Sequence, residues 1–194
     1  PLNDNCEISQ LTLTNGSSED KKLSVFSYVE WCLWNADDDM KNFQRNLSTG
    51  EVEVQDSTIY HKTEYRERRN HYAIYSVNTK IDGFDTSRDA FLGAYRGADS
   101  PEAVENGKCT NSMASGWSPI ASHQINVDLA AGETKTFIFV LGYIENPEDE
   151  KWESYGVINK TRAKEMLAKY QTDAQVDEAF AALQAYWKQL LARY

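Results

Sequence analysis

The residues of this chain best suited to bind a polar ligand lie between Asn35 and Asn46, in the stretch NADDDMKNFQRN. Its amide side chains both donate and accept hydrogen bonds, and its arginine offers a planar fork of donors. One aromatic residue among them adds an apolar surface. These side chains are suited to bind a sugar, but the same composition is typical of a solvated loop with an Asp-rich helix start. Composition alone leaves both interpretations open.

The other residues that could do chemistry form no catalytic motif. The chain has no G-x-S-x-G, no phosphate-binding loop and no dinucleotide fingerprint. His61, His71 and His123 lack metal-ligand spacing, so we expect structural histidines. Carboxylates are numerous, but the sequence assigns none of them an acid or base role. The charged run 64–69 is typical of a solvated hairpin, or alternatively of a polar contact between subunits or domains.

Composition restricts the class of protein. The chain has 194 residues and is 41% hydrophobic, which can fill a real core. Its net charge of −10 argues against nucleic acid and anionic membranes as partners. No apolar run has the length of a membrane span, and no signal peptide is visible. Cys6, Cys32 and Cys109 have no close spacing, so we expect free thiols in a cytoplasmic protein.

Alternating hydrophobic patterns predict strands in the first part of the chain. Residues 6–14 alternate and then meet Asn15-Gly16, which predicts a strand followed by a hairpin turn. Residues 23–34 are apolar on both faces, so we expect a strand covered on both sides. Further strands are predicted at 51–55, 58–61, 72–77, 124–129 and 134–144. Without a βαβ rhythm, this pattern predicts a mainly β fold, an antiparallel β-sandwich.

The middle of the chain interrupts the strand pattern. Residues 85–95 predict a short helix with Asp85 or Thr86 as its N-cap. Residues 101–107 predict a helical turn that begins at a proline and ends at a glycine. Residues 110–124 are rich in Ser and Gly and predict a long loop that enters a strand. Long loops in compact domains tend to be functional.

The last part of the chain has a helical pattern. Residues 148–152 read as an acidic connector, residues 159–170 as a helix, and Thr172 and Gln175 have capping-box spacing at the start of a second helix. The second helix carries an apolar stripe that we expect to pack in a core, namely Val176, Phe180, Leu183, Trp187, Leu190, Leu191 and Tyr194. Because the chain stops inside this pattern, we expect a segment of a larger protein, with a further domain covering part of the stripe.

Five segments together resemble the cellobiose phosphorylase family, in order and over almost the whole chain. They are WNADDDMKNFQRNLSTGEVEV, IYHKTEYRERRNHYAIYSVN, GFDTSRDAFLGAYRG, MASGWSPIASHQ and VLGYIENPEDEKWESYGVINKTRAK. The related chitobiose phosphorylases and cyclic β-glucan synthases share the architecture, but the segments look less like them.

The resemblance implies an N-terminal sandwich of the supersandwich type, a helical linker, an (α/α)6 catalytic barrel and a small C-terminal β domain. Residues 1–147 match the later part of the sandwich, so we expect it to be incomplete, and residues 148–194 match the linker helices. The implied enzyme is a glycosyltransferase-type phosphorylase that converts cellobiose and phosphate to α-glucose 1-phosphate and glucose with inversion. Inorganic phosphate is the co-substrate and no cofactor is implied. Because phosphate attacks the sugar, one protein acid suffices, and it lies on the barrel, outside this chain.

The resemblance also implies roles for five residues. The family is homodimeric, and a sandwich loop reaches the active site of the partner subunit. Gln44 and Arg45 match residues that contact the sugar in the acceptor subsite, and Asn35, Asn42 and Phe43 fall at its rim. Binding and orientation, rather than proton transfer, are the implied roles. Two alternatives remain, a free-standing carbohydrate-binding or interaction β-sandwich and a related disaccharide phosphorylase with another acceptor.

Overall fold

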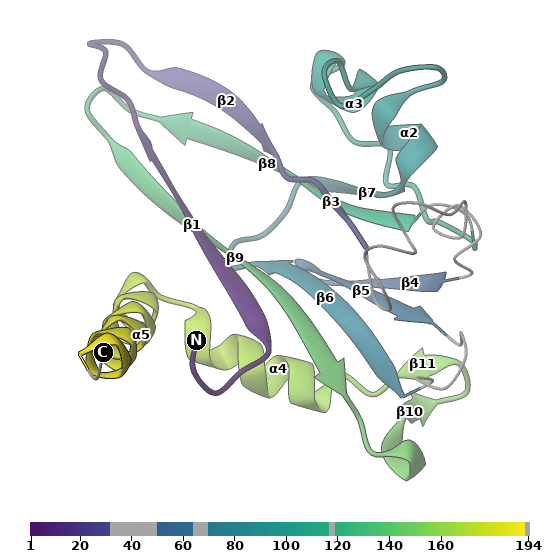
Figure 1. Cartoon of the computed structure of the whole chain (residues 1–194). Helices are drawn as coiled ribbons and strands as arrows, with labels where there is room; N and C mark the ends of the chain where they lie inside the picture. Colours follow the sequence, from purple (N-terminus) through teal and green to yellow (C-terminus); the bar gives the residue numbers. More distant parts are fainter. Residues whose placement is uncertain (32–49, 64–69, 117–118, 193–194) are drawn as a thin grey trace.

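The computed structural model describes residues 1–31, 50–63, 70–116 and 119–192. Two antiparallel sheets face each other, with helices outside them (Figure 1). The five-stranded sheet has the spatial order β1 (Cys6–Thr14), β9 (Thr134–Glu145), β6 (His71–Val77), β5 (Thr58–Thr63) and β4 (Gly50–Gln55). The four-stranded sheet has the order β2 (Lys21–Phe26), β8 (Pro119–Leu129) and β3 (Val29–Glu30), with β7 (Gly83–Ser87) also paired to β8. The predicted mainly β sandwich is confirmed.

The central strands are apolar on both faces because both faces of the five-stranded sheet are covered. One face meets the four-stranded sheet through a cluster that includes Ile59, Tyr75, Val77, Ala121, Ile125, Val127, Phe137 and Phe139. The other face meets the C-terminal helices through a cluster that includes Tyr60, Tyr72, Ile74, Ile138, Val140, Ala163, Met166 and Leu167. β9 is therefore a central strand covered on both faces, which confirms the prediction for residues 134–144.

The predicted hairpin at Asn15-Gly16 is wrong. β1 pairs with β9 and β2 pairs with β8, so residues 15–20 cross from one sheet to the other. The side-chain amide of Asn15 is buried and donates to the carbonyl oxygens of Leu129 (3.1 Å) and Ala130 (3.0 Å), while its backbone N–H donates to the carbonyl oxygen of Glu133 (2.9 Å). Asn15 thus ties the crossing to the neighbouring turn between β8 and β9, which local sequence could not reveal.

The strand predicted over residues 23–34 is interrupted, and residues 32–34 lie outside the described residues. Ser27 and Tyr28 separate β2 from β3. The hydroxyl oxygen of Ser27 accepts the backbone N–H of His123 at 2.9 Å, so the connection stays bound to β8. The predicted burial on two sides is confirmed from Val25 onward, whereas Leu23 is 43% exposed. Val25, Val29 and Trp31 pack between the sheets, and Phe26 and Tyr28 pack outside the four-stranded sheet.

Two short helices connect β7 to β8, namely α2 (Arg88–Leu92) and α3 (Glu102–Glu105). They pack outside the four-stranded sheet through Phe91, Leu92 and Ala103. The predicted helical turn is confirmed, since Pro101 precedes α3 and Gly107 follows it with a φ of 64°. The predicted N-cap of α2 is wrong, because Ser87 occupies this position while Asp85 and Thr86 belong to β7.

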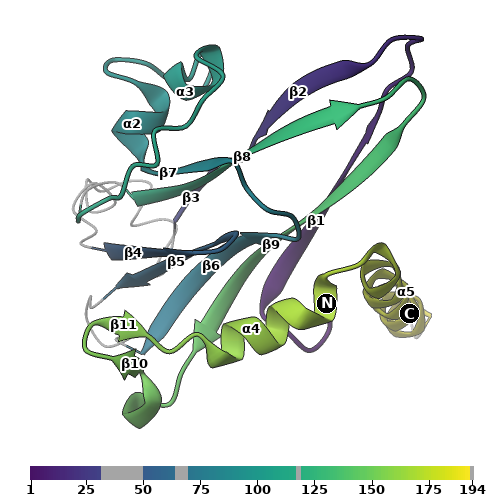
Figure 2. The same cartoon turned by 180° about the vertical axis from the view of Figure 1, so that it is seen from behind.

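The predicted acidic connector contains structure that the sequence did not reveal. It starts with the 3-10 helix η2 (Glu148–Glu150), and the small strands β10 (Trp152–Ser154) and β11 (Val157–Ile158) follow. The predicted helix over residues 159–170 appears as α4 (Thr161–Leu167) and the 3-10 helix η3 (Ala168–Tyr170). In Figure 2, α4 lies along the outer face of the five-stranded sheet.

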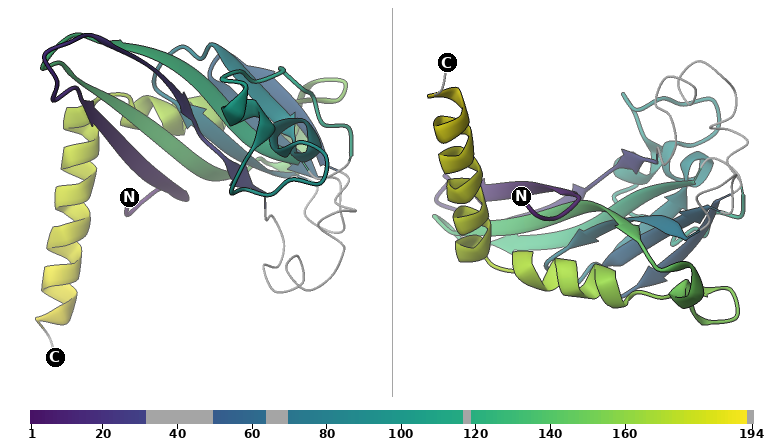
Figure 3. Two further views of the ribbon diagram at one scale, coloured as in Figure 1. Left: turned by 90° about the horizontal axis from the view of Figure 1, so that it is seen from above. Right: turned by 60° about the horizontal axis from the view of Figure 1, so that its bottom comes forward.

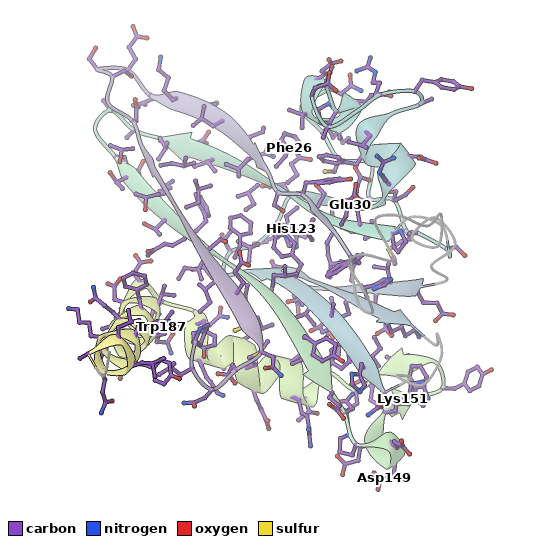
Figure 4. The ribbon with its side chains drawn as sticks, viewed as in Figure 1. Phe26, Glu30, His123, Asp149, Lys151 and Trp187 are labelled. Atoms are coloured by element: carbon purple, nitrogen blue, oxygen red, sulfur yellow. The ribbon has the colours of Figure 1, made fainter. Side chains whose placement is uncertain are left out.

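Helix α5 (Asp173–Leu191) begins with the predicted capping box of Thr172 and Gln175 and extends away from the sheets (Figure 3). The structure describes all of α5, and none of its residues is buried. Phe180 is 68% exposed and Leu191 is 64% exposed. Trp187 lies far from the acidic connector in Figure 4. The predicted core packing of the stripe holds for Val176, which packs against the core cluster. It is wrong for Phe180, Trp187 and Leu191, which are exposed because α5 runs off the sandwich, and Tyr194 lies outside the described residues.

Candidate functional site

The five candidate sugar-binding residues, Asn35, Asn42, Phe43, Gln44 and Arg45, fall in residues 32–49, outside the described residues. The charged run 64–69 also lies outside them. What the structure describes is the part of the sandwich at both ends of the segment 32–49.

Several chain segments meet at one end of the sandwich. The segment 32–49 follows β3 and precedes β4, and Gly50 at the start of β4 pairs with Thr63 at the end of β5, just before residues 64–69. Glu51 forms an isolated bridge with Ser115 in the loop before β8. We call this region the loop-bearing end: the end of β3, the start of β4, the end of β5 and residues 110–116 (right side of Figure 1).

The two ends of the segment 32–49 belong to different sheets. β3 pairs with Ala121 and Ile120 of β8 in the four-stranded sheet. β4 is the edge strand of the five-stranded sheet and pairs with β5. The two strands that flank the segment thus lie in different sheets, and the separation of these strands depends on how the two sheets are held together at this point.

A flat aromatic stack joins the sheets at this point. The rings of Trp31 and His61 are 5.3 Å apart and 8° from parallel. His61 lies on β5 opposite Val52 of β4 and is 3% exposed. Burial lowers the pKa of His61 to about 3, so the ring is uncharged at neutral pH. Trp31 Nε1 and both ring nitrogens of His61 are buried without a hydrogen-bond partner among the described residues.

Buried lysines fix the neighbouring strands. Lys62 Nζ lies 2.6 Å from Glu51 Oε2, and the lysine side chain is only 6% exposed. Lys160 Nζ lies 2.6 Å from Glu53 Oε2, with its side chain 4% exposed. The backbone N–H of Ile158 donates to Glu53 Oε1 at 2.9 Å. Because a buried charge needs a partner, these ion pairs hold β4, β5 and the small β10–β11 hairpin in one arrangement.

Asp85 anchors the loop before β8 rather than capping a helix. Its fully buried carboxylate accepts the hydroxyl groups of Thr110 and Ser112 at 2.7 Å each, together with their backbone N–H groups. Thr86 Oγ1 accepts the backbone N–H of Ala114 at 2.8 Å. These hydrogen bonds hold the loop, so both residues have a structural role.

The described cysteines and the other histidines do not form a catalytic group with Asp85. Burial raises the pKa of Cys109 to about 12, with Asp85 adding to the shift, so the thiol is neutral and a poor nucleophile. Cys6 is a free thiol, and Cys32 lies outside the described residues. His123 is fully buried and stacks on Tyr75, in the middle of the molecule in Figure 4, which agrees with the expected structural role.

The fold places the chain in the class of antiparallel β-sandwiches that continue into helices. Within this class, residues 1–173 match the family model described as the supersandwich domain of glycosyl hydrolase 94. The chain therefore belongs to the glycosyl hydrolase 94 family, and the match ends where α5 begins.

Three relatives illustrate the family. N,N'-diacetylchitobiose phosphorylase of Vibrio proteolyticus is 28% identical over 195 residues, covering 100% of this chain and 22% of that protein. Solabiose phosphorylase of Paenibacillus borealis is 26% identical over 189 residues, covering 94% of this chain and 22% of that protein. Cyclic beta-(1,2)-glucan synthase NdvB of Rhizobium meliloti is 26% identical over 182 residues, covering 93% of this chain and 6% of that protein.

These relatives support the wider family and not cellobiose phosphorylase in particular. The chain spans about a fifth of the length of the two phosphorylases, 22% of each. Within the described parts of the chain, no helix is long and apolar enough to cross a membrane.

Proposed function

We propose that this chain is the supersandwich segment of a disaccharide phosphorylase and that its segment 32–49 contributes to sugar binding. The match of residues 1–173 to the glycosyl hydrolase 94 supersandwich carries this proposal, because the same region aligns with two phosphorylases over 94% and 100% of the chain. The loop-bearing end supports it further, since its buried ion pairs and aromatic stack form a rigid base for a segment that must hold side chains in place.

The proposed reaction is the inverting phosphorolysis of cellobiose to α-glucose 1-phosphate and glucose. Inorganic phosphate attacks the anomeric carbon and one protein acid protonates the departing oxygen, so the enzyme needs no cofactor. We place that acid and the main phosphate ligands on a barrel domain outside this chain. The relatives are named for diacetylchitobiose and solabiose, so a related disaccharide with another acceptor is the alternative to cellobiose.

The proposed roles of the five candidate residues follow from their chemistry. The guanidinium of Arg45 and the amide of Gln44 bind adjacent hydroxyls of the acceptor sugar, because both groups present donors at fixed angles. Phe43 covers an apolar face of the sugar ring. Asn35 and Asn42 bind at the rim. In the proposed homodimer, these residues act in the active site of the neighbouring subunit.

The exposed stripe of α5 supports the proposed domain plan. We propose that residues 1–147 are the sandwich and that residues 148–194 form a linker, which leads to an (α/α)6 barrel of a cytoplasmic enzyme. Large apolar side chains gathered on one exposed surface mark an interaction site, and Phe180, Trp187 and Leu191 are such side chains.

Kinetics of the complete enzyme test the role of Arg45. Arg45→Ala is expected to raise the KM for glucose in the synthetic direction at least about tenfold, because it removes a charged hydrogen-bond donor to the acceptor. The KM for α-glucose 1-phosphate and the melting temperature are expected to stay near the wild-type values. Arg96→Ala, which removes a surface ion pair with Glu105 on α3, is the matched control and is expected to change neither KM.

Two outcomes contradict the proposal. If Arg45→Ala leaves the KM for glucose unchanged, Arg45 does not bind the acceptor sugar. Phosphate-dependent release of glucose 1-phosphate by this chain alone contradicts the placement of the acid outside it. Calorimetry of this chain with cello-oligosaccharides tests the alternative of a free-standing carbohydrate-binding sandwich, because such a module binds them without a partner subunit.

A further inference from the structure

Helix α5 leaves the sandwich directly after the 3-10 helix η3. Tyr170 of η3 packs against the outer face of the five-stranded sheet and is 6% exposed. Among the described residues of α5, Val176 and Ala179 in its first two turns pack against the same core, whereas Phe180 is 68% exposed. The helix is thus supported at its base. We call residues 168–173, which lead from η3 into α5, the junction.

The N-terminal segment holds the junction through Asp4. Its carboxylate accepts the hydroxyl of Tyr170 at 2.5 Å and the ammonium group of Lys169 at 2.8 Å, and the Asp4 side chain is 14% exposed. Burial opposes the ionisation of Asp4, but the hydrogen bonds from Lys169 and Tyr170 outweigh it and lower its pKa, so the carboxylate is charged at neutral pH. Because hydrogen bonds to a charged acceptor are stronger than neutral ones, Asp4 is a firm anchor.

Two further side chains of the sandwich reach the junction from other elements. The side-chain amide of Gln10 on β1 donates to Asp173 Oδ1 at 2.9 Å, at the first residue of α5. The side-chain amide of Asn78, which follows β6, donates to the carbonyl oxygen of Gln171 at 3.1 Å. The oxygen of the same amide accepts the backbone N–H of Ile138 in β9 at 2.9 Å, so Asn78 is itself fixed to the sheet.

The junction is also ordered within itself. The side-chain amide of Gln171 donates to the carbonyl oxygen of Leu167 at 2.7 Å. Gln175 Oε1 accepts the backbone N–H groups of Gln171 at 2.9 Å and of Thr172 at 3.0 Å, and the Thr172 side chain caps α5 in return. The chain therefore turns from η3 into α5 with its backbone donors paired, as a capping box provides. A turn of this kind transmits the position of its anchors to the helix.

We propose that Asp4, Gln10 and Asn78 are positioning residues, which fix the direction in which α5 leaves the sandwich before another surface covers its apolar stripe. The helix extends well past these anchors (Figure 3). From Phe180 to Leu191 it is about 17 Å long, so a swing of about 20° at the base would move its end by about 6 Å. A preset direction lowers the entropic cost of docking the stripe. The fixed direction is a property of this chain alone and does not depend on the proposed function.

The distance between two spin labels in this chain, measured by pulsed electron paramagnetic resonance, tests this role. One label is attached through Asp128→Cys on β8 and the other through Gln189→Cys on α5, both at exposed positions, with the three native cysteines replaced by alanine. With the three anchors intact, we expect one narrow distribution of distances. Without them, we expect the distribution to become at least about twofold wider, because α5 then samples several directions.

Three substitutions remove the anchors and leave the sandwich in place. Asn78→Asp removes the donor to the junction but keeps the oxygen that accepts the N–H of Ile138. Gln10→Glu replaces the donor to Asp173 with a second carboxylate. Asp4→Ala removes the acceptor for both junction side chains. The triple variant is expected to show the full widening, and Gln10→Glu alone, which alters an exposed side chain, is expected to show part of it.

Two controls separate the direction of α5 from its folding. Arg96→Ala removes an exposed ion pair with Glu105 on α3 and is expected to leave the distribution unchanged. A label pair within α5, Glu178→Cys with Gln189→Cys, is expected to stay narrow in every variant.

The positioning role is overturned by a wide distribution with intact anchors, or by a narrow one in the triple variant. It is also overturned if the label pair within α5 widens equally, because the anchors would then hold the helix together rather than direct it. If the triple variant does not fold, Gln10→Glu decides, and an unchanged width contradicts the role. Phosphorylase activity does not enter the measurement, so failure of the proposed function would leave the result standing.

Discussion

At the loop-bearing end the chain buries polar and charged side chains, whereas along α5 it leaves large apolar side chains exposed. His61 lies between the sheets and is 3% exposed, and Lys62 lies on the other face of the five-stranded sheet beside Trp152 and is 5% exposed. Phe180 on α5 is 68% exposed. Burying a charge is tolerated only where a partner is at hand, as Glu51 is for Lys62. An exposed apolar stripe is typical of a surface that binds another protein or domain.

This difference separates a region whose buried charges are paired within the chain from a helix whose large apolar side chains are exposed. The loop-bearing end makes its ion pairs and stacks within the chain, so its geometry is set by residues already present. The apolar stripe of α5 has no covering surface in the described part of the chain beyond the contacts of Val176 and Ala179 with the core. The sandwich therefore holds its own geometry, and the exposed stripe of α5 supports the interface with a further domain that we propose for it.

Truncation of apolar side chains gives the largest contrast between the two regions. Ile138 is fully buried between the five-stranded sheet and α4. Ile138→Ala is expected to lower the free energy of unfolding of this chain by about 4 kcal/mol, because it removes buried methyl groups and leaves a cavity. Phe180→Ala is expected to change it by less than about 0.5 kcal/mol. Urea unfolding followed by tryptophan fluorescence measures both, and equal losses would contradict the exposure of α5.

The buried ion pairs give the next largest effect. Lys160→Ala leaves Glu53 without its closest cation at the junction of β4 with the β10–β11 hairpin. We expect the free energy of unfolding to fall by about 2 kcal/mol, because Glu53 loses its closest charged partner and keeps the more distant Lys62 at 3.6 Å. Lys22→Ala is the control, since Lys22 and Asp128 form an exposed pair at 3.8 Å. Urea unfolding is expected to show no change for the control, and similar losses in both variants would refute the distinction.

Acid pH is expected to destabilise the sandwich through His61, whereas α5 contains no histidine. Burial lowers the pKa of His61 to about 3, against about 6.5 in the unfolded chain. Below pH 6.5 the unfolded state therefore binds a proton that the folded state does not, and stability falls as the pH falls toward 3. Between pH 7 and pH 5, wild type is expected to lose about 2 kcal/mol more than His61→Phe. Parallel stability curves of the two proteins from pH 7 to pH 5 would contradict the neutral, buried state of His61.

The pattern of the sequence predicted much of the fold because local physics decides it. Strand periodicity marks the strands, and the Thr172–Gln175 spacing marks the start of α5, since these signals depend on near neighbours. The same local signals failed where a side chain acts over a distance. Asn15 serves the turn after Leu129 in place of the predicted hairpin, and Asp85 binds Thr110 and Ser112 in place of capping α2.

For the candidate site, the sequence alone determined which residues could bind a sugar, because Gln44 and Arg45 carry their donors and acceptors wherever they lie. The sequence also identified the family, because residues 1–173 match the model of the supersandwich domain. Only the tertiary structure decided that the segment with these residues connects two different sheets, and that Trp31 meets His61 between them. Such a contact joins residues far apart in the chain, and sheet packing sets it, not the sequence around either residue.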